Sequence, residues 1–276
     1  MTKKRDFITS LIHILLILGS LVMILPFVWM VLTSFKTISE ATSMNPFVVL
    51  PIEWRFDNYI SAINQNNFLR LYFNTFSMIL INVGCALVFS SMAAYAFARL
   101  KFPGKNFCFG LVLFQMMIPT QIFIIPQYMM VDKLGARNTI FALVFPGLVS
   151  AFGTFLLRQF FKGIPDELEQ SAQIDGCNIG QTFLRIMLPQ VKSGLVALSI
   201  FTALFAFKNL MWPLIVNSSN DAATLASALA KIQSAYSVNY PVLMAASVLA
   251  IWPMILLYLF FQKQFIQSVT TSGLTI

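Results

Sequence analysis

The side chains that could do chemistry are few in this sequence, and their spacing excludes most kinds of active site. The three cysteines, Cys85, Cys108 and Cys177, include no pair at metal-ligand spacing, and the one histidine, His13, stands alone. The sequence contains no nucleophile motif, phosphate-binding loop or metal-ligand cluster. We therefore expect that this chain has no catalytic residue and no metal site, and that it binds no cofactor.

Polar residues gather instead in residues 165–189, which read PDELEQSAQIDGCNIGQTFLRIMLP and hold four of the ten acids. Pro165 suits the first position of a helix, and Asp166 and Glu167 suit the positive end of a helix dipole. Gly176 suits the left-handed position that ends many helices. The pattern predicts a short helix over residues 165–176, with Pro165 at its first position and Gly176 as its stop.

A second short helix is predicted directly after this stop. Asn178 can cap it, and Gln181 follows three residues later, as in a capping box. Apolar residues then continue up to Pro189, which we expect to end the helix. Two short helices joined by a tight turn form a rigid protrusion, and such a protrusion is suited to docking another protein.

The rest of the chain is too apolar for a soluble domain. Hydrophobic residues make up 58% of it, and the mean hydropathy is +0.79. A helix of about 20 apolar residues crosses a hydrocarbon core of about 30 Å, and barrel strands would alternate in hydropathy. We predict an all-α membrane protein with one permease domain over residues 1–276, in which six helices span the membrane at roughly residues 8–32, 71–98, 106–131, 138–157, 193–216 and 242–261.

Charge gives the orientation of these spans. With the N-terminus inside, eleven Lys and Arg residues fall in inner segments and six in outer ones. The positive-inside rule then places both termini in the cytoplasm, and the polar segment with them, as a loop over residues 162–190. The net charge of +8 does not indicate a nucleic-acid partner, because the basic residues form neither a tail nor a patch interleaved with aromatic residues.

None of the ten acids lies within a predicted span. Carriers driven by protons or other ions commonly place carboxylates at membrane depth to bind the coupling ion. An ion-coupled secondary transporter is therefore the less favoured alternative. A membrane enzyme or anchor is also disfavoured, because the chain offers neither a catalytic cluster nor a soluble domain.

The polar segment resembles the hallmark loop of permease subunits from binding-protein-dependent ATP-binding-cassette importers. That loop has Glu-Ala-Ala, three residues, Gly, nine residues and then Ile-x-Leu-Pro. Here the chain has Gln170-Ser171-Ala172, Gly176 and Ile186-Met187-Leu188-Pro189 at the same spacing, with Gln for Glu and Ser for Ala at the first two positions. Glu169 points about 100° away around a helix and is a poor substitute for that glutamate.

Further stretches are similar to the sugar-importing branch of this family, and to its second, maltose-type permease subunit. The likeness covers roughly residues 70–267 and includes AAYAFARLKFPGK (93–105), MIPTQIFIIPQYMMVDKLGARNT (117–139), IPDELEQSAQIDG (164–176) and MWPLIV (211–216).

The resemblance implies a six-helix type I importer permease fold in a bacterial cytoplasmic membrane, with residues 165–189 as a coupling loop. It also implies the partners: a second permease subunit in a heterodimer, an extracellular sugar-binding protein, and two ATPase subunits that use ATP and Mg. The cargo would be a sugar or oligosaccharide, with a non-sugar solute as the alternative. The residues implied in docking the ATPase are Glu167, Glu169, Gln170, Ser171, Ala172, Asp175, Gly176, Ile186, Leu188 and Pro189.

Four polar residues within the predicted spans could line the path of the solute: Asn82, Gln115, Lys208 and Asn209. Polar residues in spans also serve as hydrogen-bonding groups between helices. Lys208 is the most unusual of the four, because no acid of this chain lies in a span to pair with it. Its ammonium could reach the outer interface, pair with a carboxylate of a partner permease, or contact the solute.

Overall fold

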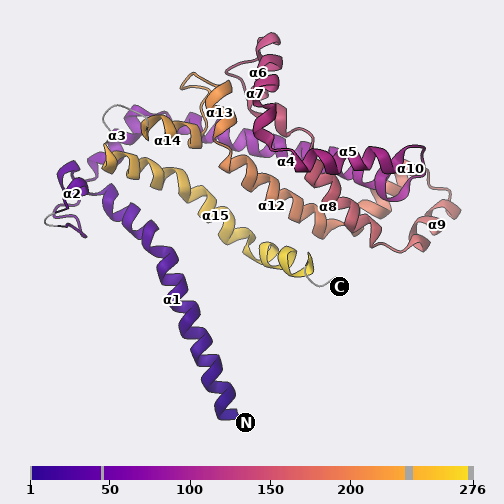
Figure 1. Ribbon diagram of the computed structural model, residues 1–276, viewed down its shortest axis with the longest axis horizontal. Helices are drawn as coiled ribbons and strands as arrows, with labels where there is room; N and C mark the ends of the chain where they lie inside the picture. The colour runs from indigo at the N-terminus through magenta and orange to yellow at the C-terminus, as the bar shows by residue number, and fades with distance from the viewer. Residues whose placement is uncertain (1, 45–46, 234–238, 273–276) are drawn as a thin grey trace. The chain divides into compact units, whose positions relative to one another are not determined.

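The structure is a computed structural model that describes residues 2–44, 47–233 and 239–272, and these ranges contain helices but no strand (Figure 1). The chain divides into two compact units, Met1–Asn67 with Leu229–Ile255, and Phe68–Ala228 with Leu256–Ile276. The first unit holds α1 (Thr2–Ser34), α2 (Ile38–Thr42), α3 (Asp57–Gln65), and parts of α14 (Leu225–Gln233) and α15 (Tyr240–Ser272). The second unit holds α4 (Phe68–Arg99), α5 (Lys105–Met117), η1 (Thr120–Phe123), α6 (Ile124–Lys133), α7 (Ile140–Val144), η2 (Phe145–Gly147), α8 (Ala151–Lys162), α9 (Asp166–Ile174), α10 (Ile179–Gln181), η3 (Thr182–Met187), α11 (Leu188–Gln190), α12 (Lys192–Lys208) and α13 (Met211–Val216).

Two of the predicted spans coincide with long uninterrupted helices. Thr9–Ser34 and Phe68–Arg99 are each long and apolar enough to cross a membrane. The apolar residues of Thr9–Ser34 are exposed all around, as expected of a helix that meets lipid or other membrane helices. The apolar stretch Tyr240–Leu256 of α15 falls within the sixth predicted span, although it is shorter.

The other predicted spans are bent. Lys105–Met117 and Thr120–Lys133 meet at 97°, and Ile140–Gly147 and Ala151–Lys162 meet at 48°. The fifth predicted span contains α13 and all of α12 except its first residue, Lys192, with a break at residues 209–210. Two helices, or up to five with bent pairs counted as one span each, meet the criteria for a span in the described residues, so the count of six stays a prediction.

Prolines account for part of this bending. Pro119 stands directly after α5, and the residue before it, Ile118, has the extended backbone that a following proline favours. Pro126 and Pro213 lie in the first turns of α6 and α13, where a missing N–H costs little. Pro26, in contrast, lies inside the continuous helix α1. The sequence therefore predicts the positions at which a helix can break. It does not predict at which of these positions a break occurs.

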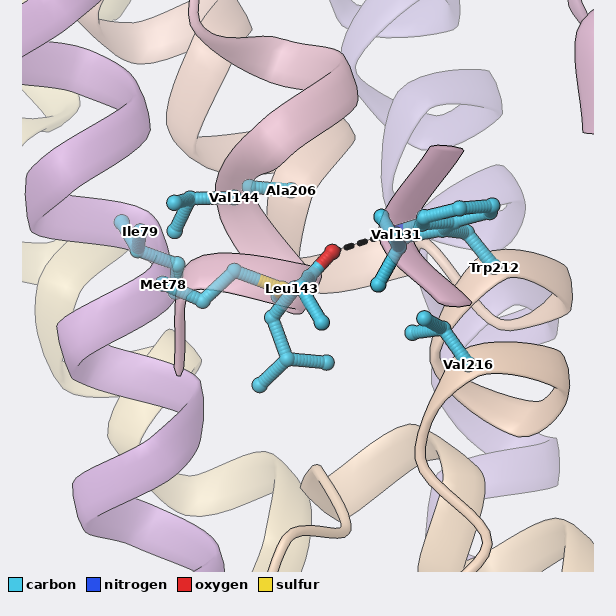
Figure 2. Packing of buried hydrophobic residues seen from close by; sticks show 9 residues of the cluster. Met78, Ile79, Val131, Leu143, Val144, Ala206, Trp212 and Val216 are labelled. Carbon is cyan, nitrogen blue, oxygen red and sulfur yellow. Dashed lines mark hydrogen bonds between the residues drawn. The ribbon is translucent and has the colours of Figure 1, made fainter. Parts of the chain in front are cut away.

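In the second unit, α4, α8 and α12 pack against one another along their lengths (Figure 1). Gly153 of α8 makes this possible, because a Cβ at that position would lie 2.6 Å from Ser90 Oγ of α4 and 3.0 Å from Leu198 Cδ1 of α12. Around this contact the unit has two apolar clusters. The first comprises Met78, Ile79, Val131, Ala142, Leu143, Val144, Ala206, Trp212 and Val216 (Figure 2). The second comprises Ala94, Tyr95, Leu157, Phe161, Met187, Val191 and Leu198.

Figure 2 shows Trp212 at one end of the first cluster, beside Val131 and Val216, with Met78 and Ile79 at the other end. The Trp212 indole is buried and donates a hydrogen bond from Nε1 to the Ala142 carbonyl over 2.8 Å. A buried indole N–H needs such a partner, so this bond fixes α13 against α7.

In the first unit, residues after α1 fold back onto its end around a buried lysine. Lys36 is fully buried, and its Nζ donates to the Val48 carbonyl over 2.7 Å and lies 4.0 Å from the centroid of the Trp29 ring. Asn58 Nδ2 donates to the carbonyls of Ser34 and Lys36, over 2.9 Å in each case. Burial lowers the pKa of Lys36, and the nearby Glu40 carboxylate opposes that shift. The ammonium group of Lys36 thus joins the end of α1 to the segment around Val48.

We predict that Lys36→Met opens this loop. The change removes a hydrogen bond and a cation–π contact, and a hydrogen bond to a charged group contributes about 1.5–3 kcal/mol. Limited proteolysis of the protein in membranes should then cleave residues 37–56 roughly tenfold faster or more. Arg55→Met is the matched control, because Arg55 is an exposed cation of the same loop. Equal cleavage of the Lys36 and Arg55 variants would contradict this role.

Candidate functional site

The predicted protrusion begins as a short helix, α9, directly after Pro165. Asp166, Glu167 and Glu169 all lie in its first turn, where carboxylates face the positive end of the helix dipole. Pro165 has a φ of −57°, which leads into the helix without requiring an N–H. The predicted helix is confirmed, with its start one residue later than predicted, because Pro165 is the N-cap and Asp166 the first helical residue.

Gly176 ends α9 as predicted, with a φ of +80°. Its N–H donates to the Gln173 carbonyl over 3.1 Å, and the Cys177 N–H donates to the Ala172 carbonyl over 3.0 Å. This pair of bonds is a Schellman motif. No other side chain or backbone atom lies within 4 Å of where a Cβ would stand at Gly176. The demand for glycine here therefore comes from the backbone conformation, because L-residues with a side chain rarely adopt a positive φ.

The second helix starts with the predicted capping box. The Gln181 N–H donates to Asn178 Oδ1, and the Asn178 N–H donates to Gln181 Oε1, each over 2.9 Å. The helix then winds as a π-helix over Thr182–Met187 and continues to Gln190. The prediction that Pro189 ends this helix is therefore wrong by one residue. Pro189 lies in the first turn of α11, where it has no need of an N–H, and the chain bends by 77° just after Gln190.

One arginine joins α9 to the rest of the second unit. Arg99, the last residue of α4, donates from Nε and Nη2 to the Phe161 carbonyl over 3.1 and 2.6 Å, and from Nη2 also to the Ile164 carbonyl. Its Nη1 pairs with the Asp166 carboxylate, and its Nε lies 4.0 Å from Glu169 Oε2. The Arg99 side chain is only 7% exposed, so its charge is balanced almost entirely by these groups.

A tyrosine makes a second link between the same two helices. Tyr95 OH donates to Glu169 Oε1 over 2.8 Å, and its ring packs against those of Phe161 and Phe183. Glu169 is only 16% exposed. It is therefore occupied within the chain, which agrees with the expectation that it does not replace the family's glutamate at position 170.

A cleft of about 1000 Å³ runs beside these links, between α9 and the carboxyl-terminal end of α4. Lys101 and Lys105 line one side of it, and Gln170 lines the other. Thr182 forms part of its wall, and Thr182 Oγ1 is buried with no hydrogen-bond partner among the described residues. The protrusion thus has a polar recess at its base.

The predicted docking residues lie together on this protrusion, but they differ in exposure. The exposed ones are Glu167, Gln170, Ser171, Asp175, Gly176 and Pro189; the half-buried ones are Glu169, Ile186 and Leu188; and Ala172 is buried. The exposed residues are thus accessible to another molecule, while the buried and half-buried ones pack within the unit.

Two exposed isoleucines belong to the same surface and were not among the predicted residues. Ile174 is 86% exposed at the end of α9, and Ile179 is 62% exposed at the start of α10. Large apolar side chains at the tip of a polar loop are typical of a surface that another protein covers. The sequence could have indicated them, because each isoleucine lies next to the polar turn at Gly176. Arg99 and Tyr95 were missed because nothing local relates them to residue 166 or 169.

The structure does not bring the four predicted path residues into one site. Asn82 of α4 is buried, and its Oδ1 packs against Gly147, where a Cβ would lie 2.7 Å away. Gln115 is exposed near the end of α5. Lys208 is exposed as the last residue of α12, and Asn209 follows it as the C-cap. No hydrogen bond joins these four side chains, all of which lie in the described part of the chain.

The position of Lys208 suggests how its charge is tolerated. A cation at the carboxyl end of a helix is stabilised by the dipole and by the last carbonyl groups. Lys208 has no carboxylate partner within the described residues. Its ammonium therefore stays available to a group outside this chain.

Comparison with known proteins gives a family for this arrangement. Residues 86–271 match the sequence pattern of the family described as "Binding-protein-dependent transport system inner membrane component". The chain is 36% identical to the arabinooligosaccharides transport system permease protein AraQ of Halalkalibacterium halodurans, over 91% of this chain and 90% of that protein. It is 31% identical to the diacetylchitobiose uptake system permease protein NgcG of Streptomyces coelicolor, over 94% of this chain and 86% of that protein.

The fold is also similar to a solved structure. A chain of a bacterial ABC transporter involved in the import of the acidic polysaccharide alginate superposes with a TM-score of 0.80, covering 94% of this chain and 96% of that one at 23% identity. The long apolar helices α1 and α4 and the three bent pairs agree with a multi-pass protein of the cytoplasmic membrane. From the matched pattern and the two whole-length relatives, it follows that the chain belongs to the family of binding-protein-dependent transport system inner membrane components, the permease subunits of ABC importers.

Proposed function

We propose that this chain is the transmembrane subunit of an ATP-driven importer that moves a sugar or oligosaccharide from an extracellular binding protein into the cytoplasm. The observation that carries this proposal is the protrusion at residues 165–190, which is locked to α4 by Arg99 and Tyr95 and exposes acids and isoleucines at its tip. A rigid, exposed loop of this kind can pass the movement of a docked ATPase into the membrane helices.

Relatives support the class of cargo. Two whole-length relatives are named for the transport of arabinooligosaccharides and of diacetylchitobiose. Both cargoes are short glycans, so we propose a short glycan for this chain as well. The second permease subunit, the binding protein and two ATPase subunits complete the proposed importer. ATP and Mg act in those ATPases, and this chain binds neither.

The first test is uptake in proteoliposomes that contain this chain with its partner subunits and binding protein. We expect labelled arabino- or chito-oligosaccharide to enter only when ATP is present on the ATPase side, and to do so with all ion gradients collapsed. Uptake that follows a proton or sodium gradient without ATP would show an ion-coupled carrier instead. Uptake of a non-sugar solute alone would keep the ATP-driven mechanism and change the cargo.

Gly176→Val tests the docking loop. Valine at a φ of +80° should cost about 1–2 kcal/mol of local conformational energy and shift the end of α9. We expect less ATPase subunit to co-purify with the chain, and less ATP-dependent uptake. Gly135→Val is the matched control, because Gly135 has a φ of +63° and open space around its Cβ position but lies outside the loop. Normal docking and uptake by the Gly176 variant would remove this turn from the interface.

Lys208→Met tests the path. We propose that Lys208 faces the route of the solute, because its side chain is exposed and has no carboxylate partner in the described chain. If its ammonium donates one hydrogen bond to the cargo, removing it should lower uptake roughly tenfold while assembly stays normal. Lys133→Met is the matched control, since Lys133 is the exposed last residue of α6.

The choice of cargo separates the remaining roles of Lys208. A loss confined to acidic saccharides would indicate pairing with an anionic substituent of the cargo. Equal loss for neutral and acidic saccharides would indicate a hydroxyl contact or a pair with the second permease. Unchanged uptake of both would overturn the proposal and leave an ammonium that extends to the outer interface.

A further inference from the structure

The cytoplasmic ends of α4 and α8 exchange arginine side chains. The last carbonyls of a helix have no partner within that helix. Arg99, at the end of α4, donates to the Phe161 carbonyl at the end of α8. Arg158 of α8 donates in return from Nε to the Phe97 carbonyl of α4 over 3.1 Å, and its guanidinium lies 3.8 Å from the centre of the Phe109 ring. Each helix thus caps the other, and the two ends form one block.

Of the two arginines, Arg99 also reaches α9. Its guanidinium offers five N–H groups in a fixed plane, of which those on Nε and Nη2 bind the Phe161 carbonyl of α8 while Nη1 faces Asp166. The ion pair is asymmetric, because the Arg99 side chain is 7% exposed and that of Asp166 is 77% exposed. The ion pair therefore connects a buried residue of the unit, Arg99, with an exposed residue at its docking surface, Asp166.

The attachment of α9 has two points, which fixes its direction as well as its place. Tyr95 and Arg99 stand four residues apart on α4 and share one face of that helix. Their partners, Glu169 and Asp166, stand three residues apart on α9 and share a face there. Two bonds between these faces resist rotation of α9 relative to α4, whereas α9 could rotate about a single bond.

Covalent connection alone would not achieve this. Only residues 163–165 join α8 to α9, and none of them belongs to a helix. α9 also packs against η3, and the bonds from Arg99 and Tyr95 are the contacts that attach it directly to α4. With them, α9 moves together with α4, whose apolar residues Met78 and Ile79 belong to the cluster in Figure 2.

We propose that Arg99 and Tyr95 are positioning residues that make α9 and α4 move as one body, so that ATP hydrolysis by a docked ATPase is coupled to transport. The inference rests on the proposed function. It assigns the coupling of ATP hydrolysis to transport to the bonds between α4 and α9. These bonds are separate from the loop surface that contacts the ATPase.

The decisive experiment measures solute imported per ATP hydrolysed by the complete reconstituted importer. In Arg99→Gln, and separately in the double variant Asp166→Asn with Glu169→Gln, we expect ATP hydrolysis to continue. Solute imported per ATP should fall by about fivefold or more, the low end of ordinary coupling between sites. Tyr95→Phe removes one of the two attachments and should give a smaller fall. Arg99→Lys keeps the charge without the planar fork and should restore coupling only in part.

The matched controls are Arg137→Gln and Asp132→Asn, which break an ion pair of 2.9 Å between exposed side chains outside the loop. Both should keep the wild-type ratio of import to hydrolysis. Co-purification of the ATPase subunits is measured in every variant, because a variant that only loses assembly would lower hydrolysis and import together and leave their ratio unchanged.

The outcomes distinguish the inference from the proposed function. A wild-type importer without ATP-dependent uptake would refute the proposed function itself. If the wild type couples normally and both the Arg99 and the double carboxylate variants keep its ratio, only the positioning role is overturned. Failure of both variants to assemble would likewise overturn it, because Arg99 would then be a residue required for folding.

Discussion

The buried positive charge of Arg99 is the constraint on which the protrusion at residues 165–190 and its junction with α4 and α8 depend. A guanidinium that is 7% exposed must find partners for its donors, and an unpaired buried charge is costly by several kcal/mol. Three separate elements supply those partners: the end of α8, the linker after it, and the first turn of α9. A single charge therefore determines where three chain segments meet. It also helps to explain why Glu169 faces inward, where its carboxylate lies near Arg99 and accepts a hydrogen bond from Tyr95.

The need to pair buried polar groups also constrains the membrane helices. Backbone groups in an apolar environment must be satisfied by helix bonds or by neighbouring side chains, so a broken span is stable only where such neighbours exist. At the break between α12 and α13, the Asn209 N–H bonds back to the Ala206 carbonyl, and the buried Trp212 indole binds α7. Close helix packing also stabilises this unit, because Gly153 lets α8 approach α4 and α12 to a distance that a side chain would prevent. Breaks and tight packing thus occur in the same unit and support one another.

Local rules predicted the protrusion well, and long-range contacts were beyond them. The start of α9, the left-handed Gly176 and the Asn178 capping box depend on residues within five positions of one another, and each is confirmed, the start of α9 to within one residue. Arg99 and Asp166 are 67 residues apart, and Tyr95 and Glu169 are 74 apart, so only folding reveals that they meet. The span positions followed from hydropathy, but their bends depend on whether neighbouring helices stabilise a break at each proline. The path residues Asn82 and Lys208 remain predictions, since hydropathy cannot tell which face of a span meets a cavity.

The two faces of α9 explain how a chain with Gln170 in place of the family's glutamate can still present a charged docking surface. Glu169 and Ala172 face the body of the unit, where the first is held by Tyr95 and the second is buried. Glu167, Gln170, Ser171 and Ile174 have the spacing of a single helix face, and all four are exposed. Glu167 therefore places a carboxylate on the same face as Gln170, one turn earlier. A cationic group on a docked ATPase would meet that charge near the start of α9, next to the Arg99 ion pair and closest to the attachment that holds the helix.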